Sequence, residues 1–113
     1  MIDENITYDA FLSYNWSIKE EIKILEEKLT HMGLKLWRDE KGLHANESSL
    51  LGEIAQAITK SKTFACFITK AYCESHNCNL EIEFANALTK PFIVLMIERY
   101  IVIFYLYIDF LVL

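Results

Sequence analysis

The chain has 113 residues, 53% of them hydrophobic and 24% charged, so it can bury one sizeable core but not two. A formal net charge of −5 argues against a general binder of the phosphate backbone, and we expect no nucleic-acid partner. Three cysteines without framework spacing, and a first segment without the pattern of a secretory signal, predict a reduced, cytoplasmic protein.

The first predicted element is a strand at Tyr8–Tyr14, with the sequence YDAFLSY. The segment is apolar on both faces and rich in aromatic residues, which is typical of a strand buried in a parallel sheet. Ligands bind at the carboxyl ends of the strands in such sheets. We therefore expect functional side chains between Ser13 and Trp16.

A helix should follow this strand. Ser17 and Glu20 have the spacing of a capping box, and Gly33 offers a C-terminal stop. Between them, apolar residues recur at helical spacing at Ile18, Ile22, Leu25 and Leu29. Residues 34–37 then predict a second short strand, and the charged residues 38–47 predict a loop.

The alternation of helix and strand continues. Ser48 or Ser49 can cap a second helix, whose apolar side carries Leu51, Ile54 and Ile58. Residues 63–68 are continuously apolar and predict a third strand.

A third helix is predicted from Asn77 or Asn79, and Lys90–Pro91 ends it. Its apolar face carries Leu80, Phe84 and Leu88. Residues 92–97 predict a fourth buried strand. Four strands separated by helical crossovers predict an α/β fold, a flavodoxin-like parallel open sheet with helices on both faces.

The end of the chain, residues 101–113, is almost entirely apolar. Glu98, Arg99 and Asp109 leave no uninterrupted run of the roughly 18 to 20 apolar residues that a membrane-spanning helix needs, so no membrane span is predicted. A fifth strand at residues 101–108 is one interpretation, and a terminal helix is the other.

Three segments in order resemble the Toll/interleukin-receptor (TIR) domain family. Residues 8–14 resemble its first motif, residues 37–40 (WRDE) its second, and residues 75–81 (SHNCNLE) the start of its third helix. The resemblance covers about residues 6–98, and it implies a single TIR-like domain over residues 1–113 with a flavodoxin-like sheet. The apolar tail, 99–113, is shorter than the end of most members, which implies a shortened C-terminal end or an incomplete sequence.

The resemblance implies a signalling module that associates with other TIR domains, either identical copies or relatives, in signal transduction and innate defence. The charged loop is the expected contact surface, because mixed charges around an exposed leucine suit a transient interface. Its residues are Asp39, Glu40, Lys41, Gly42, Leu43 and His44.

An alternative that the resemblance also implies is hydrolysis of NAD at the bond between nicotinamide and ribose. Glu81 matches the catalytic glutamate of such members, and a carboxylate can stabilise the positive charge that develops on the ribose. NAD would then be the substrate, and no cofactor is required. A glutamate in a first helical turn is equally common for stability alone, so the enzymatic interpretation stays open. The expected walls of the crevice are Ser13, Tyr14, Trp16 and Trp37.

A metal site is not predicted. Cys73, His76 and Cys78 form a Cys-x-x-His-x-Cys string, but no fourth ligand lies nearby in the sequence. Structural zinc sites are almost always four-coordinate.

Overall fold

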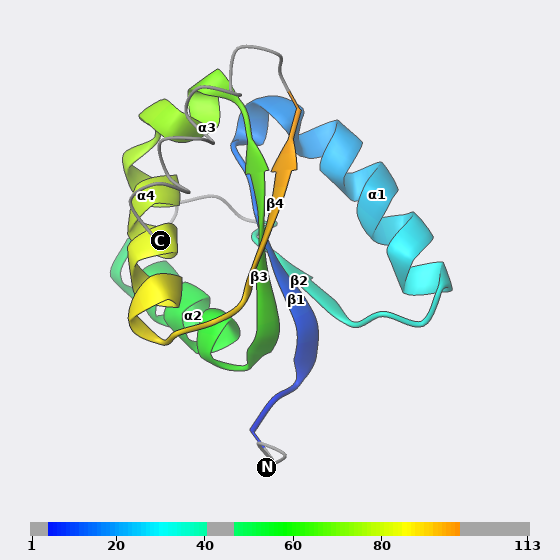
Figure 1. Ribbon diagram of the computed structural model, residues 1–113, viewed down its shortest axis with the longest axis horizontal. Helices are drawn as coiled ribbons and strands as arrows, with labels where there is room; N and C mark the ends of the chain where they lie inside the picture. The colour runs from blue at the N-terminus through cyan, green and yellow to red at the C-terminus, as the bar shows by residue number, and fades with distance from the viewer. Residues whose placement is uncertain (1–4, 41–46, 98–113) are drawn as a thin grey trace.

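The computed structural model describes residues 5–40 and 47–97, which form a parallel sheet flanked by helices (Figure 1). The strand order is β2-β1-β3-β4, and all three neighbouring pairs are parallel. This is the order of flavodoxin-like sheets, and it confirms the predicted fold class. In chain order the elements are β1 (Tyr8–Ser13), the 3-10 helix η1 (Trp16–Ile18), α1 (Lys19–His31), β2 (Leu36–Arg38), α2 (Glu47–Thr59), β3 (Ser61–Ile68), α3 (Lys70–Glu74), α4 (His76–Ala87) and β4 (Phe92–Met96).

The direction in which successive strands are added to the sheet changes at β1. It passes from β1 to β2 at one edge and then returns to β3 on the other side of β1. Ser13 at the end of β1 stands opposite Cys66 of β3 in the register of the two strands. Crevices that bind ligands form at such reversal points, outside the carboxyl ends of the strands.

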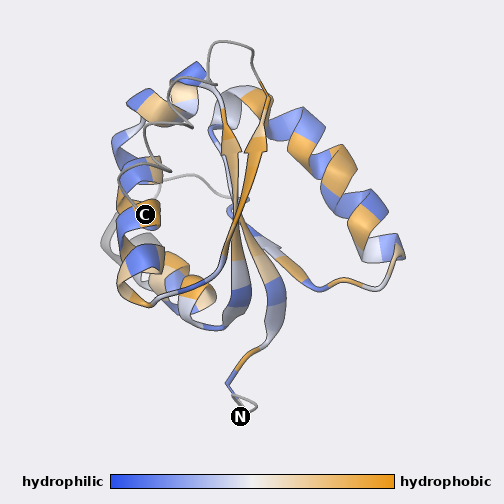
Figure 2. Ribbon diagram, in the orientation of Figure 1, coloured by the Kyte–Doolittle hydropathy of each residue, from blue (hydrophilic) through white to orange (hydrophobic). Residues whose placement is uncertain are grey.

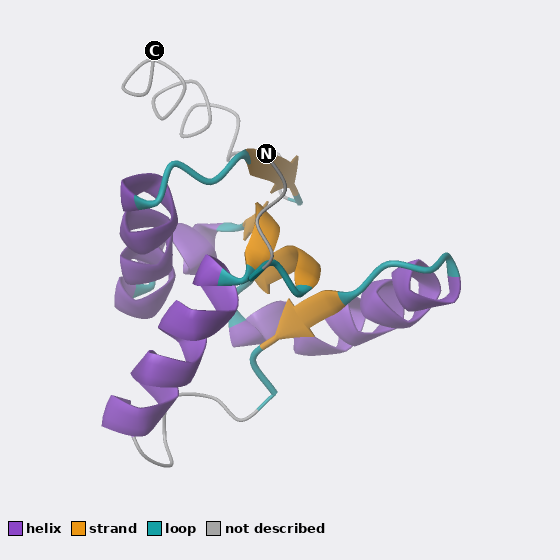
Figure 3. Ribbon diagram, turned by 90° about the horizontal axis from the view of Figure 1, so that it is seen from below, coloured by secondary structure: helices purple, strands orange, loops and turns teal. Residues whose placement is uncertain are grey.

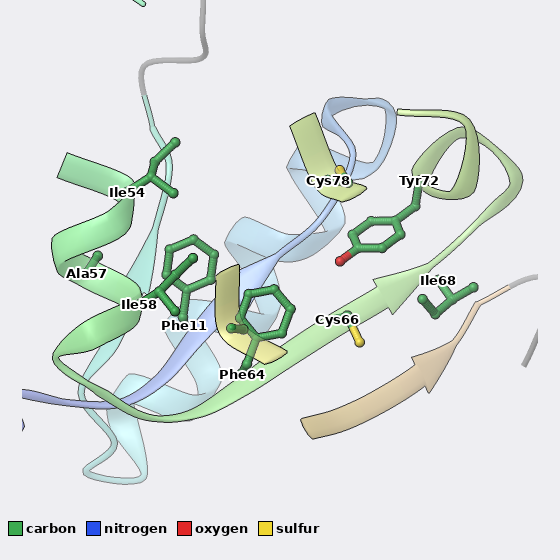
Figure 4. Close-up of a cluster of buried hydrophobic side chains, with 10 residues drawn as sticks. Phe11, Ile54, Ala57, Ile58, Phe64, Cys66, Ile68, Tyr72 and Cys78 are labelled. Atoms are coloured by element: carbon green, nitrogen blue, oxygen red, sulfur yellow. The ribbon is translucent and has the colours of Figure 1, made fainter. Parts of the chain in front are cut away.

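Both faces of the sheet are covered, because successive side chains of a strand point to opposite faces. In the described part of the chain, helix α1 and the short helix η1 cover one face, and α2, α3 and α4 cover the other (Figures 1 and 3). On the α1 face the buried residues are Ala10, Leu12, Tyr14, Ile22, Ala65 and Phe67. On the other face they are Phe11, Ile54, Ala57, Ile58, Phe64, Cys66, Ile68, Tyr72, Cys78 and Ala85 (Figure 4).

The predicted capping box at the start of α1 is wrong. The side chain of Asn15 accepts a hydrogen bond from the backbone N–H of Ser17 at 2.9 Å and opens η1. Helix α1 begins only after this turn, and its N-cap residue, Ile18, provides no side-chain hydrogen bond. Asn15, not Ser17, is therefore the residue whose side chain caps this segment. Glu20 lies inside α1 and takes no part in a capping box.

The end of α1 confirms the predicted role of Gly33. Its φ is +96°, a conformation that costs a side chain with Cβ steric energy. The N–H of Gly33 donates to the carbonyl of Thr30 at 2.9 Å, and the N–H of Leu34 donates to that of Leu29 at 3.2 Å. These two bonds form a Schellman motif, which satisfies the last carbonyls of the helix.

Two other helix starts differ from the predictions. Helix α2 begins at Glu47, so Ser48 and Ser49 lie within it. The N-cap of α4 is Ser75, whose hydroxyl accepts from the N–H of Cys78 at 3.3 Å, so this helix begins before Asn77. Residues that favour caps are frequent in these segments, and spacing alone does not tell which one serves.

Two strand bounds and one helix were also not predicted. Strand β2 begins at Leu36 and includes Arg38, which was assigned to the loop. Strand β3 begins at Ser61 rather than two residues later. Helix α3 has five residues, and Thr69 caps it by accepting from the N–H of Tyr72 at 3.0 Å. One helical turn is too short to show apolar periodicity.

The prediction that β4 is buried is wrong. Strand β4 pairs with β3 and forms an edge of the sheet over the described residues. Val94 is partly buried against the core, whereas Phe92, Ile93, Leu95 and Met96 are exposed. Figure 2 shows the strand in the orange of apolar residues. The apolar run predicted the strand but not its place at an edge.

The predicted fifth strand or terminal helix at residues 101–113 lies outside the described residues. In the described ranges, 5–40 and 47–97, none of the helices combines the length and the apolar character needed to cross a bilayer.

Candidate functional site

A buried serine and a glutamate meet at the carboxyl edge of the sheet. Ser13 is the last residue of β1, is 1% exposed, and faces the side of the sheet covered by α2, α3 and α4. Its hydroxyl donates a hydrogen bond to Oε1 of Glu81 in α4, with 2.7 Å between the two oxygens. The two residues are 68 positions apart in the sequence, and the topology brings them together.

Glu81 lies in the second turn of α4, because the helix begins at His76. The expectation that it occupies a first turn is therefore wrong. The partial positive charge of a helix terminus acts mainly within the first turn, so it favours ionised Glu81 less than expected. The first turn of α4 contains no acidic residue.

Burial raises the pKa of Glu81 from its ordinary value of 4.5 to about 7. The hydrogen bond from Ser13 opposes this shift because it favours the ionised form, and the negative charge of Asp39 adds to the shift. At neutral pH the carboxyl group is therefore divided between its two protonation states. A carboxyl group with this pKa can accept or donate a proton near pH 7.

Glu81 lines a cavity of about 220 Å³ between α2 and α4. The cavity walls are mostly apolar, formed by Ile54, Ala55, Ile58, Asn77, Leu80, Glu81 and Phe84. An engineered cavity of about 150 Å³ in another protein binds benzene, so this volume is sufficient for one aromatic ring with a small substituent. A carboxyl group at the wall of an apolar cavity can bind the polar part of such a ligand.

A third side chain completes the arrangement. Tyr72 of α3 is 1% exposed, and its Oη lies 2.7 Å from Oγ of Ser13. Figure 4 shows the phenol hydroxyl of Tyr72 directed toward β1. No pattern in the sequence marks this residue as functional. The available signal was Thr69, a favourable N-cap three residues before Tyr72.

The other expected crevice residues are not in contact with Glu81 in the described hydrogen-bond network. Tyr14 lies on the α1 face, where its ring is buried and its hydroxyl donates to the carbonyl of Asp39 at 2.9 Å. Trp16 is exposed in η1, with the ammonium group of Lys19 at 4.1 Å from its ring centroid.

Trp37 lies nearer the core, at the β2 edge of the sheet. Its ring stacks on that of Phe11, with centroids 5.0 Å apart and planes at 14°. Trp37 also lines an open cavity of about 400 Å³ together with Arg38 and four acidic residues. Those acidic residues are Glu26, Asp39, Glu40 and Glu53.

A buried arginine stands at the entrance of the charged loop. The side chain of Arg38 is 6% exposed, and its Nε lies 3.2 Å from a carboxylate oxygen of Glu26 in α1. It also donates to Oη of Tyr14 at 3.4 Å and to Glu40 at 3.3 Å. Arg38 thus joins β1, α1 and the end of β2. Asp39 and Glu40 follow directly, and the remaining loop residues, Lys41, Gly42, Leu43 and His44, lie outside the described residues.

The thiols of the site are structural in character. Burial raises the pKa of both Cys66 and Cys78 to about 12, so both stay protonated at neutral pH. In the described part of the chain, no three His, Cys, Asp or Glu side chains are grouped so that they could hold a metal ion.

The sequence matches the family model described as the TIR domain over residues 10–111. No curated protein matches it. Among solved structures, the TIR domain of the Toll-related receptor TRR-2 from Hydra magnipapillata has a TM-score of 0.69 and 20% identity, covering 82% of this chain and 73% of that one.

Two further structures come from larger chains. A metazoan TIR-STING receptor from C. gigas has a TM-score of 0.68 at 16% identity, covering 86% of this chain and 33% of that one. The TIR domains of the activated Roq1 resistosome, which directly recognises the pathogen effector XopQ, give 0.65 at 22%, covering 80% of this chain and 57% of the other. At these identities the likeness concerns the fold.

Proposed function

Because this chain belongs to the TIR domain family, we propose that it is a signalling module that acts by associating with other TIR domains, including copies of itself. The observation that carries this proposal is the number of large apolar side chains left exposed on α4, on β4 and directly after each of them, on both faces of the β4 edge. Eight large apolar side chains are exposed there in the described structure. They are Leu80, Phe84, Leu88, Phe92, Ile93, Leu95, Met96 and Ile97. A concentration of exposed apolar residues is typical of a surface that binds another protein.

The charged loop is the second part of the proposed interface. It begins at Asp39, whose backbone carbonyl accepts a hydrogen bond from Tyr14, and the hydroxyl of Tyr14 accepts one from Arg38. A fixed starting point reduces the entropy that the loop loses on binding. Opposite charges within the loop would make the association sensitive to salt.

The self-association is testable by sedimentation velocity of the full chain, so that residues 98–113 are present in every sample. Ile93→Glu places a charge on β4, and Ile24→Glu places the same charge on α1. The two isoleucines are 47% and 55% exposed, which makes them a matched pair. The proposal requires that Ile93→Glu weakens the association and that Ile24→Glu leaves it unchanged. Equal effects of the two variants would contradict it.

The loop is tested separately by changing Lys41 and Leu43 together. This double variant should lose the capture of a TIR partner while its thermal midpoint stays close to that of the unmodified protein. Loss of folding instead would mean that the loop is a structural element.

A second candidate function is the hydrolysis of NAD, and the hydrogen bond between Ser13 and Glu81 beside an apolar cavity supports it. One aromatic ring, such as nicotinamide, has a size that suits the cavity. As the bond between C1′ of the ribose and the nicotinamide nitrogen breaks, its electron pair leaves with nicotinamide. The carboxylate of Glu81 would stabilise the positive charge left on the ribose.

Water completes the proposed reaction. It attacks C1′ and gives a proton to Glu81, so the products are nicotinamide, ADP-ribose and a proton that is released to solvent. The ionised form of Glu81 is the active one in both steps. The rate should therefore rise with pH through about 7, the pKa of Glu81.

The enzymatic proposal is tested by measuring nicotinamide release from NAD at a protein concentration where association is confirmed. Glu81→Gln should lower the rate by at least about 100-fold, the range expected for the loss of a general base. Glu83→Gln removes a carboxyl group from an exposed position of the same helix and is the matched control. No release by the unmodified protein, or equal rates in both variants, would reject hydrolysis at Glu81.

A further inference from the structure

Three side chains from three elements form a continuous chain of hydrogen bonds under the carboxyl edge of the sheet. Oη of Tyr72 in α3 lies 2.7 Å from Oγ of Ser13 in β1, which lies 2.7 Å from Oε1 of Glu81 in α4. Tyr72 and Ser13 are each 1% exposed. Glu81 is the member that reaches the cavity.

The direction of donation follows from the number of protons. Ser13 has one hydroxyl proton, and it donates this proton to the carboxylate of Glu81. Tyr72 must then be the donor in its bond to Ser13. Burial raises the pKa of Tyr72 well above its ordinary value of 10, so the phenol keeps its proton across the neutral range.

Tyr72 is held firmly enough to orient its partner. The N–H of Tyr72 is bound by the capping hydroxyl of Thr69, and its ring belongs to the core cluster that includes Cys66 and Cys78. The serine hydroxyl, in contrast, can rotate about its Cβ–O bond. A donor on one side and a carboxylate on the other fix that rotation.

We propose that Tyr72 is a positioning residue that acts through Ser13 and orients Glu81, so that one carboxylate oxygen is held by β1 and the other serves a ligand in the cavity. This inference deepens the proposed hydrolysis of NAD and rests on it for its functional meaning. The physical coupling between Tyr72 and Glu81 stands independently of any activity. In this proposal the role of the short helix α3 is to place Tyr72 within hydrogen-bond distance of Ser13.

The test follows the ionisation of Glu81 by the ¹³C chemical shift of its carboxyl carbon, assigned with Glu81→Gln. Ser13→Ala removes the direct hydrogen bond to the charged form and should raise the midpoint by about 1 pH unit. Tyr72→Phe removes only the phenol oxygen and should raise it by about 0.5 pH units, because the serine donor is then less well oriented. Among the described residues, the other titratable groups close to Tyr72, Ser13 and Glu81 are Asp39, Cys66 and Cys78.

The double variant gives the decisive comparison. If Tyr72 acts through Ser13, Tyr72→Phe has no further effect on the midpoint once Ser13→Ala is present. Equal shifts in both backgrounds, or no shift from Tyr72→Phe alone, would overturn the inference. Tyr14→Phe removes a partly buried phenol oxygen on the opposite face of the sheet, and it should leave the carboxyl midpoint unchanged.

A measurement on the unmodified protein covers the case in which a variant does not fold. The ¹³Cζ shift of Tyr72 should change with the same midpoint as the Glu81 carboxyl carbon, and that of Tyr14 should not. A Tyr72 shift that stays constant through this midpoint would also overturn the inference.

The two proposals fail in different ways. If the shifts are coupled but no nicotinamide is released, hydrolysis is rejected and the positioning role of Tyr72 is retained. If NAD is cleaved, Tyr72→Phe should lower kcat more than it raises KM and should move the pH profile together with the carboxyl midpoint.

Discussion

Replacing Glu81 with glutamine should stabilise the folded protein above pH 7 and change its stability little near pH 5. In the folded protein the pKa is about 7, compared with an ordinary value of 4.5. Between these values the folded state binds more protons than the unfolded state, so stability falls as the pH rises. The separation of the two values corresponds to about 3 kcal/mol that is present below pH 4.5 and lost once the pH has passed 7.

Glutamine can still accept the hydrogen bond of Ser13 and carries no charge at any pH. Thermal unfolding followed by circular dichroism at pH 5 and pH 8.5 measures the difference between the two proteins. At pH 8.5 the midpoint of Glu81→Gln should be higher by about 10 °C, given the usual unfolding entropy of a domain of this size. A difference that is the same at both pH values, or that Glu83→Gln reproduces, would refute the raised pKa of Glu81.

Three further predictions concern the scaffold. Arg38→Met should destabilise the fold by about 2 kcal/mol in urea denaturation, because Glu26 loses its partner, whereas Arg38→Lys should cost less. Gly33→Ala should cost about 1 kcal/mol in the same assay, from the positive φ alone, since nothing lies within 4 Å of an added Cβ. Cys66 and Cys78 should resist iodoacetamide at pH 8 until the protein is unfolded in urea, as mass spectrometry would show; rapid labelling of the native protein would contradict their burial.

The number of strands and the parallel, flavodoxin-like class of the sheet were predictable from the sequence, because segments of strand character alternate with segments of helical periodicity. The starts of the helices were not, because several capping residues stand close together before α2 and α4. Asn15 precedes Ser17 before α1 in the same way. At η1 and α4 the side chain that binds the free N–H groups is Asn15 and Ser75 respectively, and the path of the preceding residues, a tertiary feature, selects it.

The pairing of Ser13 with Glu81 was within reach of the sequence, since parallel topology brings strand ends and following helices to one edge. The alternation of side chains along β1 also separates Ser13 from Tyr14, which therefore lies on the other face. Tyr72 and the exposure of β4 depend on contacts that no local pattern encodes. The place of Tyr72 depends on the one-turn helix α3, and the exposure of β4 depends on the position of this strand at the edge of the sheet.

The unequal covering of the two sheet faces has a consequence for the motions of the protein. Over the described residues, α1 is the long helix on its face of the sheet, and it contributes one buried residue, Ile22. Such an element can separate from the sheet in a local opening that leaves β1 and β3 intact. Backbone amides of α1 should therefore exchange with deuterium well before those of the two central strands, with rates set by this partial opening rather than by global unfolding.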